Sequence, residues 1–463
     1  MIYEAVKANY ALPLEGYPFQ VETVNELGPL PRAGYYLDPG TGKTFCATAS
    51  ALYKRDTRKS QTIVVMPPIL LDGWAKFLNR IPGLGVTIYR GTPTQRNGMV
   101  LGADFILMST QILKQDFDRL DAYFRGKPVT LIIDEATSVK NISSANHKMI
   151  HNFVLNHDCD LMLLTGTPLT TPADAYAYIK LTAPGTYRNL GQFEKIHVAE
   201  RDFFDKVTKW QHLDVLASNM AINAKRVIKE HVLTQLPPVT YTPMIYELAP
   251  KHLRLYNKLA EEQLLLLEDG GKIDATSAPA LWSALQQIIL NYAHFSQEEG
   301  ARSAGYDLLD EVLAELGDRK LLVFANYRMS NRALVEYTKP YQGVAIFGDI
   351  SAAQKQKNIQ TFINVKTCRV LVAQPTSGGY GVDGLQDVCS DVLFLEAPRT
   401  PTEFEQALAR LYRNGQMKGV HCRIAVANKT LQVGLHRALL DKDDLVTQVQ
   451  GKFNTLRNMI YGV

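Results

Sequence analysis

Short, continuous runs of apolar residues recur along the chain and indicate buried strands. None of them alternates between apolar and polar positions, so each is predicted to be covered on both faces of a sheet. The runs span Gln61–Met66, Thr130–Asp134, Asp160–Leu164, Lys320–Phe324, Arg369–Ala373 and Asp391–Leu395. Between them, helical periodicity is present at Lys43–Lys54, Ile69–Asn79, Met329–Thr338, Ala352–Phe362 and Pro401–Tyr412. Strands that alternate with helices predict parallel sheets joined by right-handed crossovers.

This strand and helix pattern occurs twice, at residues 34–170 and again at residues 319–427, and predicts an α/β protein with two lobes. The stretch between them is longer and helix-rich, and Leu236-Pro237-Pro238 interrupts it because proline lacks the backbone N–H that helices and sheets use. We therefore expect a first lobe at residues 1–236 with a helical insertion at 190–230. The second lobe is expected at residues 237–463 with a helical insertion at 250–316.

Composition excludes several classes of protein. A chain of 463 residues with 46% hydrophobic and 21% charged residues is typical of a globular protein with two or three domains. The net charge of +4 argues weakly against a surface dedicated to DNA, but it does not exclude a local basic groove. The five cysteines form no C-x-x-C pair, which excludes a zinc ribbon, and no apolar run is long enough to cross a membrane. We expect a cytoplasmic protein without a membrane partner.

A glycine-rich segment, Asp38-Pro39-Gly40-Thr41-Gly42-Lys43-Thr44, follows an apolar stretch and precedes a helical pattern. Glycines allow the backbone N–H groups of such a loop to converge on phosphate oxygens, where the N-terminus of the helix adds its positive dipole. Lys43 supplies a cation for the phosphates, and the Thr44 hydroxyl can bind Mg²⁺. Although a surface turn could share this sequence, its position between a strand and a helix favours a phosphate loop.

Two acids, Asp134 and Glu135, stand at the end of a predicted buried strand of the same lobe. An aspartate there can hold Mg²⁺, while the neighbouring glutamate can orient and deprotonate an attacking water. Another strand of this lobe ends in Thr165-Gly166-Thr167-Pro168, which alone would be read as a simple turn.

The second lobe contains Gln406, Arg410 and Arg413 in a predicted helix. Their spacing of four and then three residues places them on one helical face. Such a face can be merely solvated, or it can deliver two guanidinium groups across an interlobe cleft to the γ-phosphate of ATP.

Taken in order, these segments resemble the superfamily-two helicase core, and within it the Swi/Snf family of double-stranded DNA translocases. Leu163–Leu169 resembles the family segment L-L-T-G-T-P-I, and Gln406–Gln416 resembles Q-A-x-x-R-x-x-R-x-G-Q. Pro18-Phe19-Gln20 is similar to the adenine-reading P-Y-Q, and Gly378–Asp383 is similar to G-G-x-G-I-N. Ile63–Trp74 and Gly348–Phe362 also resemble segments of this family.

The resemblance implies two RecA-like lobes, with ATP and Mg²⁺ as cofactors. It implies catalytic roles for Glu135, Lys43, Arg410, Arg413 and Gln406. It implies a nucleotide site formed by Gln20, Pro39, Gly40, Thr41, Gly42, Lys43 and Thr44, with Mg²⁺ on Thr44 and Asp134. The DNA contacts that it implies are Ser109, Thr110, Ser377 and Gly378.

The sequence departs from the family pattern at several positions without losing a group that hydrolysis requires. These positions are Leu37 at the entrance of the phosphate loop, Thr137, Gln356, Asp383 and Tyr412. The departures concern nucleic-acid contacts and the coupling between ATP and DNA more than the ATPase chemistry.

The leading hypothesis is a DNA-dependent ATPase that moves along DNA and remodels forks, junctions or bound proteins. One alternative is a helicase that separates DNA or RNA strands, and another is a non-catalytic module that binds or anneals nucleic acid. The expected partner is DNA (duplex, forked or branched), and proteins of replication, recombination or repair are further candidates. We expect a monomer in the cytoplasm of a bacterial or phage-infected cell. A basic segment at Lys225–Lys229 could contact DNA phosphates, brace the second lobe, or be a solvated helix end.

Overall fold

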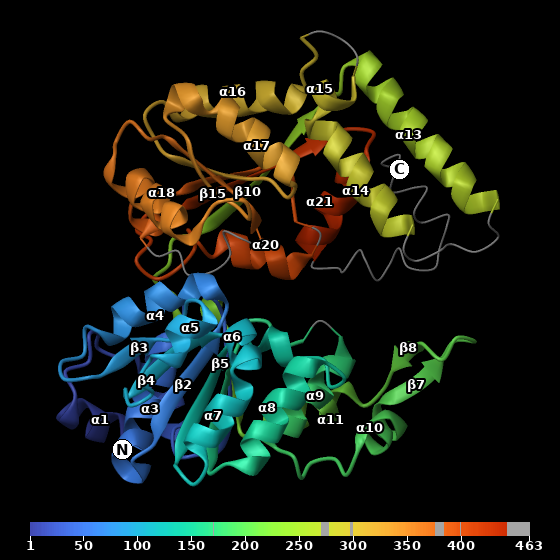
Figure 1. Cartoon of the computed structure of the whole chain (residues 1–463). Helices are drawn as coiled ribbons and strands as arrows, with labels where there is room; N and C mark the ends of the chain where they lie inside the picture. The colour runs from blue at the N-terminus through green and yellow to red at the C-terminus, as the bar shows by residue number, and fades with distance from the viewer. Residues whose placement is uncertain (170, 270–276, 297–299, 376–383, 399, 442–463) are drawn as a thin grey trace. The chain divides into compact units, whose positions relative to one another are not determined.

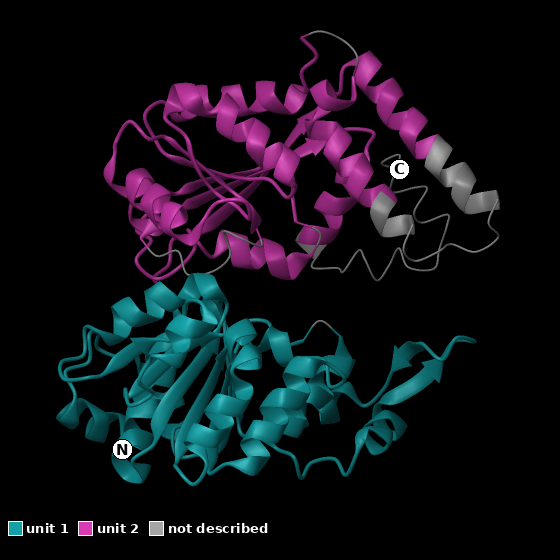
Figure 2. Cartoon of the chain, viewed as in Figure 1, with its two compact units in different colours: residues 1–234 teal, residues 235–463 magenta. Residues whose placement is uncertain are grey.

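Two compact units divide the chain between Thr234 and Gln235 (Figure 2). The computed structural model describes residues 1–169, 171–269, 277–296, 300–375, 384–398 and 400–441. The division falls beside Leu236-Pro237-Pro238, where neither proline can donate a backbone hydrogen bond. Each unit is built around a sheet flanked by helices (Figure 1).

A seven-stranded sheet forms the centre of the first unit, in the order β3-β4-β2-β5-β6-β1-β9. All neighbouring strands in it are parallel. The strands are β1 (Arg32–Leu37), β2 (Gln61–Met66), β3 (Val86–Ile88), β4 (Phe105–Ser109), β5 (Val129–Asp134), β6 (Cys159–Leu164) and β9 (Ala224–Val227). Because the strands are parallel, all seven carboxyl ends meet at one edge of the sheet.

Alternate residues of these strands enter two separate hydrophobic cores, one on each face of the sheet. Ile63 and Val65 of β2 belong to one core, whereas Val64 and Met66 belong to the other. The first core is completed by α6 (Thr110–Gln115), α7 (Phe117–Phe124), α8 (Ala145–Asn156), α9 (Pro172–Thr182), α10 (Leu190–His197) and α11 (Leu213–Met220). The second is completed by α1 (Ile2–Asn9), α2 (Pro18–Leu27), α3 (Lys43–Arg58) and α4 (Leu71–Leu78). Burial on both faces explains why the strands are continuously apolar.

A six-stranded sheet forms the centre of the second unit, in the order β10-β15-β14-β11-β13-β12, again with parallel neighbours. Its strands are β10 (Val239–Tyr246), β11 (Leu321–Phe324), β12 (Val344–Ile346), β13 (Val370–Ala373), β14 (Asp391–Phe394) and β15 (Val420–Ala427). One face is covered by α16 (Ala304–Leu316) and α17 (Arg328–Tyr337). The other is covered by α13 (Pro250–Asp269), α14 (Ser277–Leu290), α18 (Ala352–Asn364), α20 (Pro401–Leu408) and α21 (Leu431–Asp441).

Short elements complete the two units. In the first unit they are η1 (Pro68–Leu70), α5 (Pro93–Asn97), η2 (Ala136–Val139) and α12 (Lys229–Val232). In the second unit they are α15 (Tyr292–Phe295), η3 (Lys339–Tyr341) and η4 (Leu385–Asp387).

The α/β prediction is confirmed, and the six apolar runs each correspond to a strand, with ends shifted by at most one residue in most cases. The helix-rich expectation for residues 190–230 is wrong in part. Between α10 and α11 the chain forms an antiparallel hairpin of β7 (Val198–Arg201) and β8 (Val207–Trp210), which projects from the first unit (Figure 1). The segment then ends in β9, which joins the main sheet beside β1. Both strands of the hairpin are largely polar and half-exposed, so no continuous apolar run marks them.

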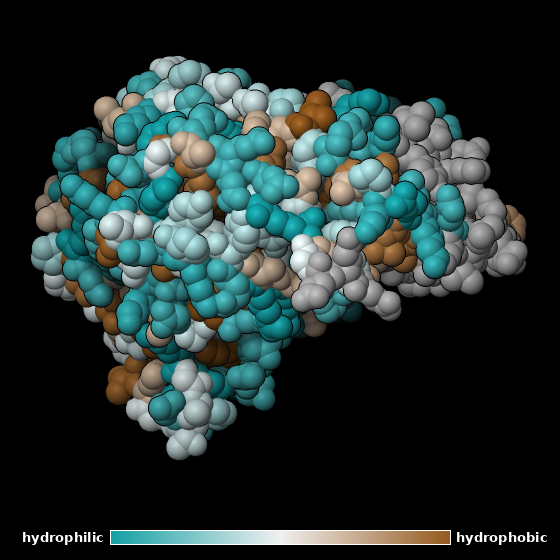
Figure 3. Space-filling view, turned by 90° about the horizontal axis from the view of Figure 1, so that it is seen from above, coloured by the Kyte–Doolittle hydropathy of each residue, from teal (hydrophilic) through white to brown (hydrophobic). Residues whose placement is uncertain are grey.

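The surface seen in Figure 3 is mainly hydrophilic, with small and separate hydrophobic areas. Within the described ranges, no helix is both long and apolar enough to cross a membrane.

Candidate functional site

The phosphate loop lies between β1 and α3, at the carboxyl edge of the first sheet. Gly40 and Gly42 both have positive φ angles, +85° and +89°, which L-amino acids with a side chain rarely adopt. Gly42 is the N-cap of α3, so the helix begins at Lys43 and its first N–H groups have no partner within the helix. The loop therefore presents backbone donors and the positive end of a helix dipole at one place, which suits phosphate.

Gln20 packs directly against this loop. Its Nε2 donates to the backbone oxygen of Thr41 at 2.9 Å, and its Oε1 accepts from the N–H of Tyr17 at 3.0 Å. A Cβ at Gly42 would approach Nε2 of Gln20 to 2.2 Å, so a larger residue there would displace the amide of Gln20 as well as strain the backbone. The amide of Gln20 therefore holds the loop in place through these bonds. The predicted contact of Gln20 with adenine did not include this role.

Lys43 and Thr41 are both engaged with the loop backbone. The ammonium group of Lys43 donates to the carbonyl of Leu37, the last residue of β1, at 3.0 Å. The Thr41 hydroxyl donates to the carbonyl of Asp38 at 2.7 Å. Thr44 follows on the first turn of α3 and is half-buried. The ammonium of Lys43 is consequently held at the mouth of the loop, where a phosphate can replace the carbonyl as its partner.

Asp134 ends β5, two strands away from β1, and its carboxylate is fixed from two sides. The indole Nε1 of Trp74 in α4 donates to Oδ2 at 2.8 Å, and the N–H of Glu135 donates to Oδ1 at 2.9 Å. Asp134 lies opposite Leu164 of β6, which in turn lies opposite Tyr35 of β1. The sheet therefore brings Asp134 to the same edge as the phosphate loop.

Burial raises the pKa of the Asp134 carboxyl, and three interactions oppose this effect. These are the positive charge of Lys43, the bond from Trp74 and the bond from the N–H of Glu135. A buried carboxylate beside the ammonium group of Lys43, at the same sheet edge as the Thr44 hydroxyl, is a donor set that suits a hard cation such as Mg²⁺. The bond from Trp74 was not predicted, although Trp74 ends the segment Ile63–Trp74 that resembles the family.

Glu135 has a left-handed backbone, with φ of +51°, and begins the short helix η2. Glutamate rarely adopts this conformation, and strained residues of this kind concentrate at functional sites. The hydroxyl of Thr137 lies 3.4 Å from the carbonyl of Glu135. The turn directs the chain away from β5 immediately after the two acids, and Glu135 is half-buried.

Thr165-Gly166-Thr167 follows β6 and touches the phosphate loop. A Cβ at Gly166 would lie 2.7 Å from Cδ of Pro39, so the absence of a side chain permits this close approach. The N–H of Thr167 donates to the hydroxyl oxygen of Thr165 at 3.1 Å. Within the described part of the chain, the buried hydroxyl of Thr167 has no hydrogen-bond partner. This orphaned polar atom beside the loop fits a site that receives a polar ligand.

Asp38 connects the phosphate loop to the last strand of the first unit. Its Oδ1 forms an ion pair with Nη2 of Arg226 at 2.5 Å, and its Oδ2 accepts from the N–H of Lys229 at 2.8 Å. Arg226 belongs to β9, so this basic residue neutralises the acid at the start of the loop.

The basic segment at Lys225–Lys229 is therefore not a helix end, as one hypothesis held, but an edge strand followed by the short helix α12. Lys225 forms ion pairs with Glu22 and Glu26 of α2 at 3.1 and 2.7 Å. Lys229 is buried. These basic side chains form their contacts within the first unit, which argues against a role in binding DNA phosphates.

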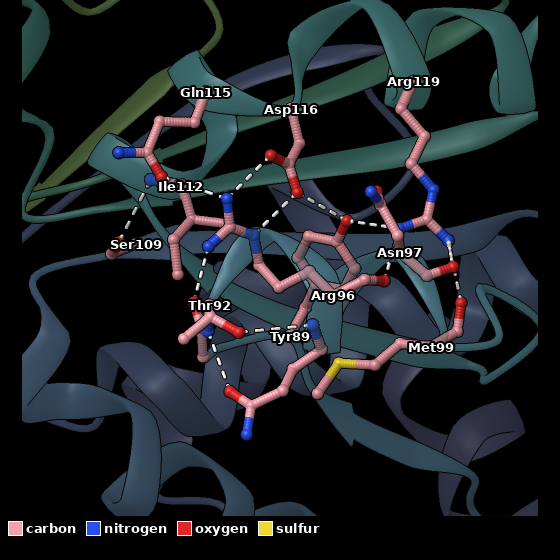
Figure 4. A network of polar contacts seen from close by, with 12 residues as sticks. Tyr89, Thr92, Arg96, Asn97, Met99, Ser109, Ile112, Gln115, Asp116 and Arg119 are labelled. Carbon is pink, nitrogen blue, oxygen red and sulfur yellow. Dashed lines mark hydrogen bonds and ion pairs between the residues drawn. The ribbon is translucent and has the colours of Figure 1, made fainter.

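Ser109 and Thr110, the predicted DNA contacts of the first unit, lie where β4 passes into α6. The Ser109 hydroxyl accepts from the N–H of Ile112 at 3.3 Å and caps this helix (Figure 4). Both residues lie at the carboxyl edge of the sheet. The neighbouring segment at Tyr89–Met99 is connected to α6 and α7 by the hydrogen bonds and ion pairs drawn in Figure 4. The other predicted DNA contacts, Ser377 and Gly378, lie outside the described residues.

Gln406, Arg410 and Arg413 do not share one helix face, so this part of the prediction is wrong. The helix α20 contains Gln406 but ends at Leu408. The N–H groups of Arg410 and Leu411 bond three residues back instead of four, which tightens the chain into turns. The two arginines thus belong to the turns that follow α20.

The side chain of Gln416 holds the turns that follow α20. Its Nε2 donates to the carbonyl of Leu411 at 3.3 Å and to the carbonyl of Cys389 at 3.0 Å. Gly415 next to it has a φ of +94°, which reverses the chain toward β15. One local and one long-range bond of Gln416 thus stabilise turns where the sequence predicts a continued helix.

A buried carboxylate that the sequence did not reveal, Glu396, organises the carboxyl edge of the second sheet. Its Oε2 accepts from the N–H groups of Asn326 and Tyr327 at 2.8 and 3.2 Å, and its Oε1 accepts from the Ser330 hydroxyl. Asn291 donates to Ser330 at 2.8 Å and extends this network to the end of α14. Burial raises the pKa of Glu396 to about 7, while the three donated bonds oppose the shift. A lone glutamate between apolar residues is its only mark in the sequence.

A cavity of about 900 Å³ opens at the amino edge of the second sheet, which is opposite the edge that carries the predicted motifs. Two of its basic residues are engaged in the fold. Arg319 pairs with Asp391 at 3.1 Å, and Lys320 donates to two backbone carbonyls at 2.7 and 2.8 Å.

Family models match both units of the chain. The SNF2-related domain matches residues 37–294, and the helicase conserved C-terminal domain matches residues 304–415. An uncharacterized ATP-dependent helicase of Mycoplasma pneumoniae is 23% identical over 429 residues, covering 88% of this chain and 39% of that protein. The DNA annealing helicase and endonuclease ZRANB3 of Mus musculus is 24% identical over 425 residues, covering 88% and 38%. The chain thus spans about two fifths of the length of these relatives.

Among solved structures, this chain is similar to the Sulfolobus solfataricus SWI2/SNF2 ATPase core in complex with dsDNA. The identity is 20%, with 97% of this chain and 98% of that chain covered and a TM-score of 0.44. The Sulfolobus solfataricus SWI2/SNF2 ATPase core domain gives 20% identity, coverages of 97% and 95%, and a TM-score of 0.42.

Proposed function

The chain belongs to the SNF2-related domain family, and from this premise we propose that it is a DNA-dependent ATPase that moves along DNA. The observation that supports this proposal most directly is the meeting of three features at one sheet edge. The phosphate loop, the buried Asp134 and the strained Glu135 all follow strands of the same parallel sheet. Parallel α/β sheets bind ligands at the carboxyl ends of their strands.

Each group of this edge has a distinct part in hydrolysis. The loop N–H groups and the Lys43 ammonium bind the phosphates of ATP. The Thr44 hydroxyl and the Asp134 carboxylate would hold Mg²⁺, which supplies positive charge to the phosphate oxygens when it is bound. Glu135 orients a water molecule and accepts its proton as the water oxygen bonds to the γ-phosphorus. The bond from the γ-phosphorus to the β-phosphate oxygen breaks, which leaves ADP and inorganic phosphate.

Arg410 and Arg413 supply the second part of the proposal. A guanidinium group beside the γ-phosphate stabilises the charge of the transition state, and its loss lowers turnover by about 10³–10⁵-fold in other phosphoryl-transfer enzymes. DNA would stimulate hydrolysis by favouring the conformation in which these arginines reach the nucleotide.

The nucleic acid along which we propose that the protein moves is duplex DNA. Forked or branched duplexes are expected to stimulate hydrolysis most effectively. The match to a relative named as a DNA annealing helicase supports this choice. A motor that grips phosphates without reading bases must bind less tightly as salt increases, because binding releases counterions. Action as a monomer in the cytoplasm, with replication, recombination or repair proteins as partners, belongs to the same proposal.

The test is phosphate release measured without nucleic acid and with single-stranded, duplex and forked DNA and with RNA. We expect duplex or forked DNA to stimulate the rate most, and Lys43→Ala and Glu135→Gln to abolish this stimulation. Lys76→Ala is the matched control because Lys76 is exposed on α4. Retained stimulation in Lys43→Ala or Glu135→Gln would contradict the mechanism, and equal rates with every nucleic acid would contradict the DNA track.

A further inference from the structure

The hairpin of β7 and β8, which projects from the first unit in Figure 1, carries two phenylalanines at its tip. Phe203 is 96% exposed and Phe204 is 76% exposed. The next most exposed aromatic side chains among the described residues, Tyr241 and Phe295, are 46% and 40% exposed. Single apolar side chains on a surface are ordinary, whereas two adjacent aromatic rings in solvent indicate a binding element.

The base of this hairpin is held firmly by the body of the first unit. Val198, the first residue of β7, lies opposite Trp210, the last residue of β8. Trp210 packs against the hydrophobic core that contains Phe193, and the centroids of the two rings are 6.3 Å apart. The hydroxyl of Tyr187 lies 2.6 Å from Nε2 of the buried His197, which directly precedes β7. The hairpin is therefore a fixed projection of the first unit.

The tip itself is closed by bonds among its own residues. Oδ1 of Asp202 accepts from the N–H groups of Phe204 and Lys206 at 3.0 and 2.9 Å. Nη1 of Arg201 donates to the carbonyl of Asp205 at 2.8 Å and lies 3.3 Å from the carboxylate of the same residue. Asp205 has a left-handed backbone, with a φ of +61°, which costs free energy. These contacts hold the two aromatic rings outward before a ligand binds, so less entropy is lost on binding.

The two rings keep their flat faces open to a ligand. Their centroids are 5.5 Å apart and their planes are inclined by 86°, so the rings of Phe203 and Phe204 are not stacked on each other. Flat aromatic ligands such as nucleobases stack on open ring faces of this kind, and they do so whatever the base.

The charges of the hairpin favour contact with bases over contact with phosphates. Residues 198–210 contain three acidic and three basic side chains, so the net charge of the hairpin is zero. Lys209 pairs with Glu200 at 3.0 Å, and Arg201 pairs with Glu194 at 3.1 Å in addition to Asp205. Affinity for a phosphate backbone comes from lysines and arginines that replace counterions, and a neutral hairpin with paired charges does not supply it.

Building on the proposed function, we propose that the tip of this hairpin is a base-stacking wedge for branched DNA. The faces of bases within an intact duplex are covered by the neighbouring base pairs, so an aromatic ring stacks where the strands part. Phe203 and Phe204 stack on the bases at the junction of a fork, while the motor acts on the adjoining duplex. The class of substrate that this role assigns is DNA with unpaired bases at a junction.

The experiment compares a forked duplex with a relaxed, covalently closed circular duplex, which has neither ends nor unpaired bases. ATP hydrolysis by the full chain is measured against the concentration of each DNA. We expect the double variant Phe203→Ala/Phe204→Ala to raise the half-stimulating concentration of the fork about tenfold, because loss of an aromatic stack on a base costs about one to two orders of magnitude in affinity. With the circular duplex it should stay within about twofold of wild type, because the contacts with phosphates are unchanged.

A fluorescent base reports the stacking directly. 2-Aminopurine at the first unpaired position of the fork should lose fluorescence when wild type binds, because stacking on an aromatic ring quenches it. The double alanine variant should not quench it at a DNA concentration where that variant is bound. 2-Aminopurine in the interior of the duplex arm is the control position and should not respond to either protein.

Further variants make the result specific to a flat ring. The double variant Phe203→Tyr/Phe204→Tyr should retain the affinity of wild type for the fork, whereas Phe203→Leu/Phe204→Leu should behave like the double alanine variant. Asp202→Ala keeps both rings but removes two bonds that fix the tip, and it should weaken binding of the fork by less than the loss of the rings. Leu155→Ala is the matched control, because Leu155 is an exposed apolar residue of α8.

The outcomes separate the two proposals. If wild-type hydrolysis does not respond to any DNA, the proposed function fails, and this inference fails with it. If wild type responds but the double alanine variant matches it on the fork, only the stacking role is overturned, and the exposed rings are left to a protein partner. Full retention of fork affinity by the double leucine variant would overturn the stacking role as well. So would a reduced dependence of DNA affinity on salt in the double alanine variant, because it would assign the tip to phosphates.

Discussion

Trp74 donates its indole proton to Oδ2 of Asp134 over 2.8 Å, although the two residues lie 60 positions apart in the sequence. This bond is one of the interactions that counteract the effect of burial on the pKa of Asp134. The ionised carboxylate is the form that binds a cation, so Trp74 widens the pH range in which the site can function.

Trp74→Phe should move the acid limb of the pH profile of ATP hydrolysis upward. Removal of the donor raises the pKa of Asp134 further, and activity is then lost at a higher pH as the solution is acidified. A hydrogen bond to the ionised carboxylate favours the charged form, so its loss favours protonation of Asp134. The measurement is kcat/KM across the acidic and neutral range. Trp282→Phe is the matched control, since the buried Nε1 of Trp282 has no hydrogen-bond partner among the described residues. An unchanged acid limb in Trp74→Phe would refute the role of this bond.

Gly42→Ala should abolish nucleotide binding, while Gly83→Ala should not affect it. Both glycines have positive φ angles, +89° and +75°, so each substitution introduces a backbone penalty of about 1–2 kcal/mol. Only at Gly42 would the new Cβ also clash, at 2.2 Å from Nε2 of Gln20, whereas nothing lies within 4 Å at Gly83. Binding of a fluorescent ATP analogue and thermal melting distinguish the two effects. Equal nucleotide affinity in both variants would show that the clash is absorbed without deforming the loop.

Glu396→Gln should flatten the pH dependence of the stability of the second unit. The folded-state pKa of about 7 lies above the ordinary value of 4.5, so the folded form binds more protons than the unfolded form between these two values. The contribution of Glu396 to stability is therefore greatest at acidic pH and is lost as pH rises through 7, by about 3 kcal/mol in total. Urea unfolding at several pH values measures this loss in wild type and its absence in Glu396→Gln. Glu336→Gln serves as the control because Glu336 is exposed beside Lys339. A slope as steep in Glu396→Gln as in wild type would assign the pH dependence to other groups.

Much of the fold could be predicted because two-sided burial leaves a clear signal. Strands such as β2 and β5 are buried at nearly every position, and their two faces supply separate cores. The edge strands β3 and β9 were missed because they are short and only partly buried, so no apolar run marks them. In α20 the helical periodicity of the sequence continues beyond Leu408, but the chain forms turns there, and Gln416 bonds to the carbonyl of Cys389, 27 residues away in the sequence.

In the candidate site, too, local features could be predicted from the sequence, whereas contacts between distant residues could not. Spacing was sufficient to locate Gly40, Gly42 and Lys43 in a loop before a helix, because such loops depend on local backbone geometry. The contribution of Gln20 to that loop and of Trp74 to Asp134 could not be inferred by spacing alone, since both depend on residues brought together by the sheet. Glu396 was overlooked for the same reason, because its three donors come from the segment after β11 and from the first turn of α17.

The contacts of Asp38 with Arg226 and Lys229 limit the conformational freedom of the chain where it leaves the first unit. Leu233 is also buried there, so the chain stays attached to this unit almost to the division after Thr234. Two prolines follow at Pro237 and Pro238, and each restricts the backbone to a narrow range of φ. The segment that joins the two units is therefore short, and its backbone has little conformational freedom. A displacement of Asp38 on ATP binding or product release would therefore act directly on β9 and α12, the last elements before the chain leaves this unit.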